Sequence, residues 1–286
     1  MRSADIEKFI EEIVPTMLEA GAFALAQQGR VENVGKEVQV RAEEINNDFL
    51  VQRQQAKTVV DEQVQERLLS AAHKILGQSV RIDAEEATPS TKLFTTDADT
   101  TLVLDPIDGT LQYVNGSPEF SLNLGLVSQG SISAAIVYFP AHKTLYLLDA
   151  EGYAYRCLCD EQGIAEKQLL TAPAEVKNET VYVNHRVPNQ ECLARSYRVI
   201  KDADNEVLWT DGFFKVQSGE YKAALFLRPQ IWDVLLGAII AAIPGGYAVD
   251  FKGDKVHWPD GGRVQEVAFG FGELPVEIKE CLNRTT

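Results

Sequence analysis

The sequence predicts a layered α+β protein, on the strength of its length and two patterns along the chain. At about 150 residues per domain, 286 residues correspond to one large domain or two smaller ones. Apolar residues recur at helical spacing at the N-terminus, and a series of short β-rich segments separated by turns begins after residue 77. In a doubly wound sheet each strand would instead be followed by a helix.

Two amphipathic helices are expected before residue 78. The first covers residues 5–28 and stops at Gly29; its apolar face consists of Ile6, Phe9, Ile10, Ile13, Met17 and Leu18. The second covers residues 61–76 and stops at Gly77; its apolar positions are Val64, Leu68, Ala71 and Ile75. Residues 31–55 are polar and show no clean period, so either helix or loop remains open there.

The segments after Gly77 predict an antiparallel meander. These segments are SVRID, TLVLD, FSLNLGLVS, SISAAIVYF, TLYLLDA and GYAYRCL, with turn residues such as Gln129-Gly130 between them. The remainder predicts a strand at VYVNH, a helix after Asn189, and a helix from Asp233 to about Ala242. We expect a single unit over residues 1–286, with a possible division into 1–175 and 176–286.

Composition narrows the function classes. Hydrophobic residues make up 45% and charged residues 24%, as in ordinary globular proteins. The 27 basic and 42 acidic residues give a net charge of −15, which repels nucleic-acid backbones and argues against a nucleic acid polymer as partner. The longest apolar run, residues 234–243, is far below the roughly 18 residues of a membrane span. The N-terminus lacks the apolar core of a signal peptide, so a cytoplasmic location is expected.

The four cysteines show no zinc-binding spacing. Cys157 and Cys159 have no second pair or nearby histidine, and Cys192 and Cys281 stand alone. We therefore expect four reduced structural thiols.

The most informative segment is TLVLDPIDGT, residues 101–110. An apolar run brings Asp105 to a strand end, and Pro106, which cannot continue a ladder, predicts a turn. Asp108 follows three residues later, before Gly109 and the hydroxyl of Thr110. Two carboxylates beside exposed backbone N–H groups suit a hard cation and a phosphate together. The structural alternative is an Asp-Gly turn with Asp108 as a helix N-cap.

Further acids occur near expected element ends. Glu85 and Glu86 follow a short strand, and adjacent carboxylates repel unless water or a cation screens them. Asp233 opens an otherwise apolar helix, where simple capping is the alternative interpretation. Thr58-x-x-Asp61 has the spacing of a capping box. Each acid alone is weak evidence for a site, whereas the combination favours one.

In consistent order from Thr58 to Gly253, these motifs resemble the inositol monophosphatase family, which belongs to the magnesium-dependent, lithium-sensitive sugar and nucleotide phosphatases. The resemblance implies a layered αβαβα sandwich that holds Mg²⁺ between its two halves. It also implies a phosphomonoesterase that acts on inositol monophosphate or a related small phosphate ester through metal-activated water. The expected partners are a small phosphorylated substrate and, in a possible homodimer, a second copy of the chain.

The same resemblance assigns roles to residues. Implied metal ligands are Glu85, Asp105, the carbonyl of Ile107, Asp108 and Asp233, with the phosphate on the N–H groups of Gly109 and Thr110. The implied substrate-binding set is Glu85, Ile107, Asp108, Gly109, Thr110 and Asp233, and the implied catalytic set is Thr110, Asp61 and Glu85. A covalent aspartyl mechanism does not fit, because Pro106 occupies the position two residues before Asp108 where the nucleophile would stand.

Two alternatives stay open. The EFS element at residues 119–121 resembles the 3'(2'),5'-bisphosphate nucleotidases of the same superfamily, although Leu111 stands where those enzymes often carry Lys. The other is a non-catalytic relative that keeps the metal site. Phe226 aligns with an acid that contacts a sugar hydroxyl in the inositol enzymes, so an apolar wall and broad specificity are expected there.

Overall fold

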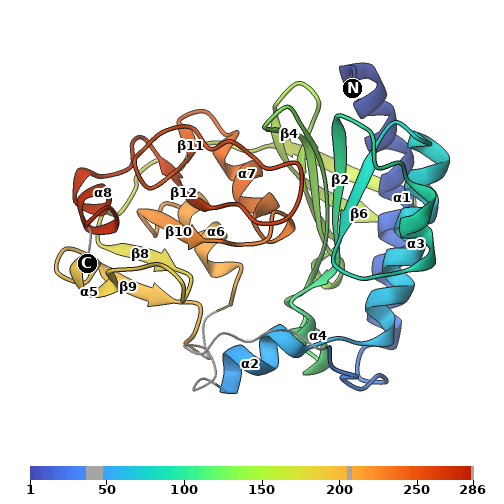
Figure 1. Cartoon of the computed structure of the whole chain (residues 1–286), viewed down its shortest axis with the longest axis horizontal. Helices are drawn as coiled ribbons and strands as arrows, with labels where there is room; N and C mark the ends of the chain where they lie inside the picture. Colours follow the sequence, from blue (N-terminus) through green and yellow to red (C-terminus); the bar gives the residue numbers. More distant parts are fainter. Residues whose placement is uncertain (37–47, 205–207, 285–286) are drawn as a thin grey trace.

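The structure is a computed structural model that describes residues 1–36, 48–204 and 208–284, apart from the side chains of residues 49, 50, 53 and 54. It is an αβαβα sandwich, in which two sheets are separated and flanked by helices (Figure 1). This confirms the expected fold class. A division at residue 175 stays a prediction.

The described helices and strands follow the chain in this order. The α-helices are α1 (Ser3–Gln27), α2 (Asp48–Gln55), α3 (Val59–Leu76), α4 (Thr110–Val114), α5 (Gln190–Leu193), α6 (Asp211–Gln217), α7 (Leu235–Ala241) and α8 (Val276–Leu282). Short 3-10 helices are η1 (Pro89–Leu93), η2 (Pro140–His142) and η3 (Trp232–Val234). The strands are β1 (Arg81–Ala84), β2 (Thr100–Asp108), β3 (Ser121–Ser128), β4 (Ser131–Phe139), β5 (Thr144–Leu148), β6 (Ala154–Asp160), β7 (Gly163–Leu169), β8 (Thr180–Val183), β9 (Arg198–Lys201), β10 (Ala223–Leu227), β11 (Gly246–Val249) and β12 (Glu266–Phe271).

The first sheet has seven strands in the order β1 to β7. Strands β2 to β6 are antiparallel neighbours, as the meander predicts, and β7 pairs antiparallel with β6, but β1 runs parallel to β2. The prediction that β1 belongs to the antiparallel meander is therefore wrong. Residues 85–99, with η1 among them, form the longer connection that parallel neighbours need.

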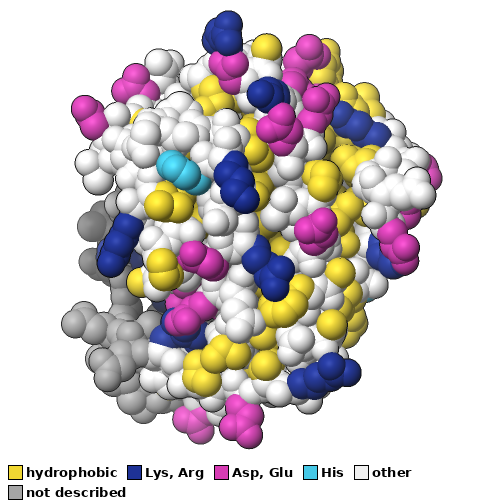
Figure 2. Space-filling view, turned by 90° about the vertical axis from the view of Figure 1, so that its right-hand side faces the viewer, with side chains coloured by type: hydrophobic (Ala, Val, Ile, Leu, Met, Phe, Trp, Pro, Cys, Tyr) yellow, Lys and Arg dark blue, Asp and Glu magenta, His cyan; other side chains and the backbone are white. Residues whose placement is uncertain are grey.

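Two helices cover one face of this sheet. The long helices α1 and α3 lie side by side against it (Figure 1), and their apolar faces bury Phe9, Ile13, Val64 and Leu68 with the strands. Both helices end near the expected glycines. Seen from this side, charged residues of both signs are interspersed with small apolar areas (Figure 2).

The other face of the first sheet packs against α6 and α7, which separate it from the second sheet (Figure 1). That sheet has the order β11-β12-β10-β8-β9, with β8 parallel to both of its neighbours. Its outer face packs against α8 through a third apolar cluster. The five layers thus follow the order helix, sheet, helix, sheet, helix.

Three elements differ from the sequence predictions. The helix after Asn189 is only the single turn α5, and the expected helix from Asp233 starts as η3 before α7 begins at Leu235. Strand β7 was not predicted, because its side chains are exposed along the sheet edge and lack an apolar alternation.

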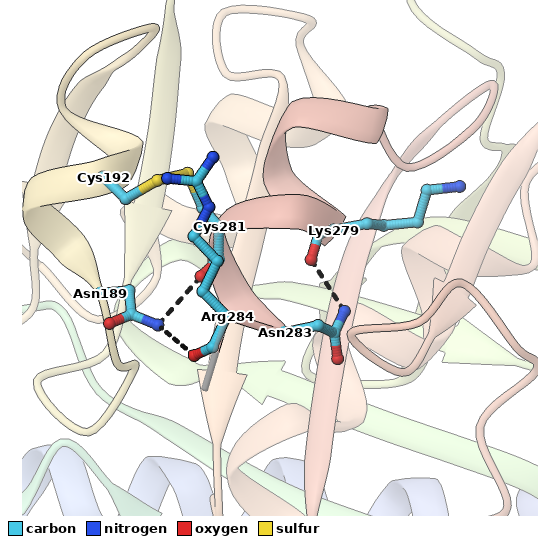
Figure 3. The surroundings of a disulfide bond; sticks show 6 residues. All are labelled: Asn189, Cys192, Lys279, Cys281, Asn283 and Arg284. Atoms are coloured by element: carbon cyan, nitrogen blue, oxygen red, sulfur yellow. Dashed lines mark hydrogen bonds between the residues drawn. A yellow bond between two sulfur atoms is a disulfide. The ribbon is translucent and has the colours of Figure 1, made fainter. Parts of the chain in front are cut away.

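The expectation of four reduced thiols is wrong for one pair. Cys192 and Cys281, 89 residues apart, form a disulfide between α5 and α8 (Figure 3). The side-chain amide of Asn189 donates to the carbonyl oxygens of Cys281 (3.0 Å) and Arg284 (3.2 Å) beside it. Sequence spacing gave no indication of the pairing, because the two helices meet only in the folded chain. Cys157 and Cys159 are free and buried, as expected.

No helix in the described ranges is long and apolar enough to cross a membrane.

Candidate metal and phosphate site

The DPIDGT segment forms the end of β2 and the turn into α4. Pro106 does not end the strand, contrary to prediction: β2 continues to Asp108 through an irregularity. Asp105 pairs with Asn123 and Asp108 with Ser121, so three steps along β2 match two along β3. One extra residue of this kind kinks a strand and redirects its side chains. Both carboxylates are thereby aimed at the same side of the sheet.

Asp233 joins these two carboxylates from the second half of the chain. One carboxylate oxygen from each of Asp105, Asp108 and Asp233 lies within 4.8 Å of the others. Asp233 does not cap a long helix, since it lies inside η3 and Val234 precedes α7 as its N-cap residue. Its Oδ2 instead accepts the N–H of Gln230 at 3.2 Å.

Burial and like charges make this group of acids unstable without a cation. Burial raises the pKa of Asp105 well above its ordinary value, and the charges of Glu85, Asp108 and Asp233 raise it further. Such a shift means that the carboxylates cannot all ionise unless positive charge compensates them.

Glu85 lies beside the three-carboxylate cluster, next to Asp105, and forms an ion pair with Lys36. Burial disfavours the charged form of Lys36. The negative charges of Glu85 and Glu86 together have the larger effect, so the pKa of Lys36 is raised. Lys57 forms an ion pair with Glu86, with its Nζ 2.7 Å from Glu86 Oε2. Sequence reasoning missed both lysines, although the adjacent acids did indicate that a cation must screen them.

Thr110 and Asp61 form a second polar group behind the cluster. The Thr110 hydroxyl lies 2.8 Å from the Ile107 carbonyl oxygen and 3.2 Å from Asp61 Oδ1. Asp61 Oδ2 accepts the N–H (2.8 Å) and hydroxyl (2.6 Å) of Thr58, which confirms the capping box at the start of α3. Burial raises the pKa of Asp61 to about 6, against these hydrogen bonds.

Gly109 allows the chain to turn between Asp108 and Thr110. It is the residue that precedes α4, so the alternative in which Asp108 serves as N-cap does not hold. Its φ of 88° is strained for other residues, and a Cβ there would stand 3.0 Å from the Glu119 carbonyl oxygen and 3.1 Å from Trp209 Nε1. Gly109 thus lets the chain pass directly from Asp108 into α4.

Asn123 is a further site residue that sequence reasoning missed. Its amide donates to Asp108 Oδ2 at 2.8 Å and to the Trp232 carbonyl oxygen at 3.2 Å, so it links β2 to η3. A polar residue in the buried pattern FSLNLGL was the available signal.

The expectation that Phe226 forms an apolar wall of the substrate site is wrong. Its ring is 7% exposed and lies in the core between the sheets. It stacks on Phe213 at a ring distance of 5.1 Å and contacts Tyr182 and Phe269. Broad specificity can therefore not be argued from this side chain.

The donors fit a hard divalent cation. Mg²⁺ takes oxygen ligands at about 2.1 Å, which places opposite ligands roughly 4.2 Å apart. The mutual spacing of up to 4.8 Å among the three carboxylates is close to this geometry. Glu85 lies next to Asp105 of this cluster, and the Ile107 carbonyl oxygen accepts the hydroxyl of Thr110.

Comparison with known proteins identifies the family and agrees with the fold. The sequence pattern of the inositol monophosphatase family matches residues 19–281. The chain belongs to the inositol monophosphatase family. The match extends beyond both ends of the motif range from Thr58 to Gly253.

The curated relatives that the chain resembles carry names of three different kinds. The chain is 26% identical over 159 residues to the fructose-1,6-bisphosphatase/inositol-1-monophosphatase of Thermotoga maritima, covering 54% of this chain and 58% of that protein. It is 27% identical over 159 residues to the 3'(2'),5'-bisphosphate nucleotidase CysQ of Salmonella typhimurium, covering 54% and 61%. The Nus factor SuhB of Pasteurella multocida is 24% identical over 200 residues, covering 65% and 70%. The chain spans less than two thirds of the length of several of these relatives.

Solved structures match over nearly the whole chain. The Thermotoga maritima IMPase superposes with a TM-score of 0.68 at 20% identity, covering 96% of each chain. An IMPase/NADP phosphatase in complex with Mg²⁺ and phosphate gives 0.69 at 18% identity, covering 96% and 95%. At these identities the likeness establishes the fold.

Proposed function

We propose that the protein is a Mg²⁺-dependent phosphomonoesterase that hydrolyses a small phosphate ester, with inositol monophosphate as the first candidate. The observation that carries the proposal is the meeting of Asp105, Asp108 and Asp233 beside the Thr110–Asp61 pair. Family membership and the Mg²⁺ and phosphate named for the IMPase/NADP phosphatase support the same conclusion.

In this proposal Glu85, Asp105, the Ile107 carbonyl, Asp108 and Asp233 hold the metal. Bound Mg²⁺ lowers the pKa of a coordinated water and neutralises charge on the phosphoryl oxygens. The N–H groups of Gly109 and Thr110 bind the phosphate, since the first N–H groups of a helix have no partner within it.

The protein's own residues orient and deprotonate the attacking water. The Thr110 hydroxyl binds the water and Asp61 Oδ1 accepts the hydroxyl proton, for which the 3.2 Å spacing is suitable. Glu85 would hold the same water together with Thr110. The buried oxygen Asp61 Oδ2 stays occupied by Thr58, so only Oδ1 is available to Thr110.

Phosphate release tests the proposal. Protein freed of metal by a chelator should release no phosphate from inositol 1-phosphate, sugar phosphates or nucleoside bisphosphates, and Mg²⁺ should restore release. Asp108→Asn, which keeps the side-chain size but removes one ligand charge, should lower kcat by orders of magnitude. Asp149→Asn is the matched control, since Asp149 orders the β5–β6 turn by accepting the N–H groups of Glu151 at 3.1 Å and Tyr153 at 2.8 Å.

Undiminished turnover in chelator would contradict the metal dependence. Full activity of Asp108→Asn would show that the DPIDGT assignment is wrong. Metal binding without release from any ester would favour a non-catalytic relative, an alternative raised by the similarity to proteins named Nus factor SuhB.

A second candidate is a 3'(2'),5'-bisphosphate nucleotidase. The similarity to CysQ and the EFS element at residues 119–121 favour it. The ratio of kcat/KM for adenosine 3',5'-bisphosphate to that for inositol 1-phosphate separates the two. A ratio above a thousandfold in either direction, about 4 kcal/mol, would identify the substrate class. The homodimer and the cytoplasmic location stay predictions.

A further inference from the structure

A turn from the second half of the chain docks on the first sheet beside the carboxylate cluster. The loop between β11 and β12 extends from the second sheet toward the first (Figure 1), and residues 259–264 form its far end. Asp260 and Gly262 contact β1 and β2 there. This loop has no part in the chemistry proposed above.

Three polar contacts hold the turn on the sheet. The Gly262 N–H donates to Asp83 Oδ2 at 2.5 Å. Arg81 pairs with the Asp260 carboxylate at 2.8 Å, and the Thr101 hydroxyl donates to the Asp260 carbonyl oxygen at 2.7 Å. Arg81 also donates to Thr101 at 2.9 Å, so the two strands present one connected docking surface.

The pleat of the strands puts this surface on the same face as the metal ligands. Side chains two residues apart lie on the same face of a strand. Asp83 therefore lies on the face of Glu85, two residues later, and Thr101 on the face of Asp105, four residues later. The intervening Leu102 and Leu104 belong to the core under α1 and α3, on the opposite face. The turn therefore approaches from the side on which Asp233 lies.

The turn also binds the segment that precedes Asp233. The Gly262 carbonyl oxygen accepts the N–H of Ile231 at 3.0 Å, and Gln230 forms an antiparallel bridge with Arg263. Gln230 in turn exchanges hydrogen bonds with Asp233, each at 3.2 Å. A short path of hydrogen bonds thus leads from Asp83 through Gly262 to the 3-10 helix that carries Asp233.

Gly261 shows how closely the turn approaches the carboxylate. Its φ is 141°, and a Cβ built on it would stand 3.0 Å from Asp83 Oδ2. The space between the turn and β1 is filled by the Asp83 side chain, so this residue sets their separation.

We propose that Asp83 is a positioning residue: by holding Gly262 it places Asp233 in register with Asp105 and Asp108. Asp233 is the cluster member that comes from outside β2. Its distance to Asp105 and Asp108 therefore depends on how η3 docks on the first sheet. Mg²⁺ requires near-ideal octahedral geometry, and a small displacement of one ligand weakens binding. The inference rests on the metal site of the proposed function.

Measuring the affinity for Mg²⁺ tests the positioning role of Asp83 without any need for turnover. Titration calorimetry with Mg²⁺ on the full chain should show that Asp83→Ala raises Kd about tenfold, in the range found for residues that orient metal ligands. Asp83→Asn should stay near the wild-type Kd, because its side-chain oxygen can still accept the Gly262 N–H. Asp250→Ala is the matched control: Asp250 accepts the N–H groups of Lys252 (2.8 Å) and Asp254 (2.9 Å) in the same loop, and only the melting temperature should change.

If Asp83→Ala does not fold, Thr101→Val takes its place. This variant removes the hydroxyl that donates to the Asp260 carbonyl oxygen with little change of shape, and it should raise Kd above the wild-type value. If Asp83→Ala, or Thr101→Val in its place, is folded and binds Mg²⁺ with the wild-type Kd, the positioning role is overturned. A rise in Kd for Asp250→Ala as large as that for the tested variant would overturn it as well. Phosphate release is measured separately. Wild-type protein that binds Mg²⁺ without turnover would contradict the proposed function alone. Wild-type protein that does not bind Mg²⁺ would contradict both the proposed function and the positioning role of Asp83.

Discussion

At the scale of single residues, Asp61 shows how one carboxylate serves both structure and proposed chemistry. Its Oδ2 closes the capping box with Thr58, and its Oδ1 lies beside Thr110. The first contact is local in sequence, whereas the second joins residues 49 positions apart. Only the first can therefore be predicted from spacing alone.

Replacement of Asp61 by Asn should separate these two roles. Asn still offers an oxygen to the Thr58 N–H, so we expect the free energy of unfolding to change by only about 1 kcal/mol at neutral pH in the presence of Mg²⁺. The amide cannot accept the Thr110 proton, so kcat should fall about 100-fold or more. Steady-state kinetics and thermal melts measure the two effects.

Thr58→Val is the matched control for this experiment. It removes the hydroxyl that accepts the Val60 N–H at 3.1 Å and donates to Asp61 Oδ2 at 2.6 Å, which should cost about 1 kcal/mol of stability. Turnover should fall far less than in Asp61→Asn, because the Thr58 N–H still donates to Asp61 Oδ2 at 2.8 Å. Wild-type kcat in Asp61→Asn would restrict Asp61 to a capping role.

The raised pKa of Asp61 predicts a pH-dependent stability difference. With a pKa of about 6 in the folded state against an ordinary 3.8, the folded chain retains a proton that the unfolded chain has lost. The stability that Asp61 contributes is therefore present below pH 3.8 and lost as the pH rises through 6. Because Asn cannot ionise, the stability of Asp61→Asn relative to wild type should increase by up to about 3 kcal/mol between pH 4 and pH 7. Urea denaturation in chelator measures it, and a pH-independent difference would contradict the raised pKa.

At the scale of elements, α8 is fastened at several points near the C-terminus. The disulfide joins it to α5, and the Asn283 amide donates to the Phe251 carbonyl oxygen at 2.9 Å (Figure 3 shows the disulfide and Asn283). A cross-link across 89 residues restricts the unfolded chain strongly.

Reduction of this disulfide should lower the free energy of unfolding by about 2–4 kcal/mol. Urea denaturation with and without reductant measures the change. The variant Cys192→Ser should be insensitive to reductant. Cys157 and Cys159 should not interfere, since burial raises the pKa of each thiol to about 11 and keeps both protonated at neutral pH. Equal stability of the wild type under both conditions would contradict a formed disulfide.

At the scale of the whole molecule, the carboxylate cluster joins two layers of the sandwich. Asp105 and Asp108 come from the first sheet and Asp233 from the segment that leads into α7 between the sheets. Leu235 packs behind Asp233 on the first sheet, where a Cβ on Gly125 would stand 2.9 Å from the Leu235 Cδ2. A metal at this position would therefore stabilise the association of these two layers.

Mg²⁺ should accordingly raise the stability of the entire chain. At 100 times its Kd, a ligand that binds only the folded state adds about 2.7 kcal/mol to the free energy of unfolding. Thermal melts across a Mg²⁺ series should show this rise, and Asp108→Asn should show much less of it. An identical response of the two proteins would place the stabilising metal elsewhere.

Much of the fold was predictable because the signals are local. The ends of α1 and α3 follow from Gly29 and Gly77, and the antiparallel strands β2–β6 follow from alternating segments with turn residues between them. The parallel pairing of β1 could not be predicted, since a strand of four residues with a long connection carries no direction of pairing. The exposed strand β7 lacked the apolar pattern that marks the others.

The sequence by itself determined which acids stand at element ends, the capping box at Thr58, and the resemblance of DPIDGT to one family, because each depends on neighbours within a few residues. The tertiary structure decided that Asp233 reaches Asp105, that Lys36 pairs with Glu85, and that Phe226 belongs to the core. It also decided the pairing of Cys192 with Cys281. These contacts join distant parts of the chain, and the packing of the layers, rather than any local preference, brings their side chains together.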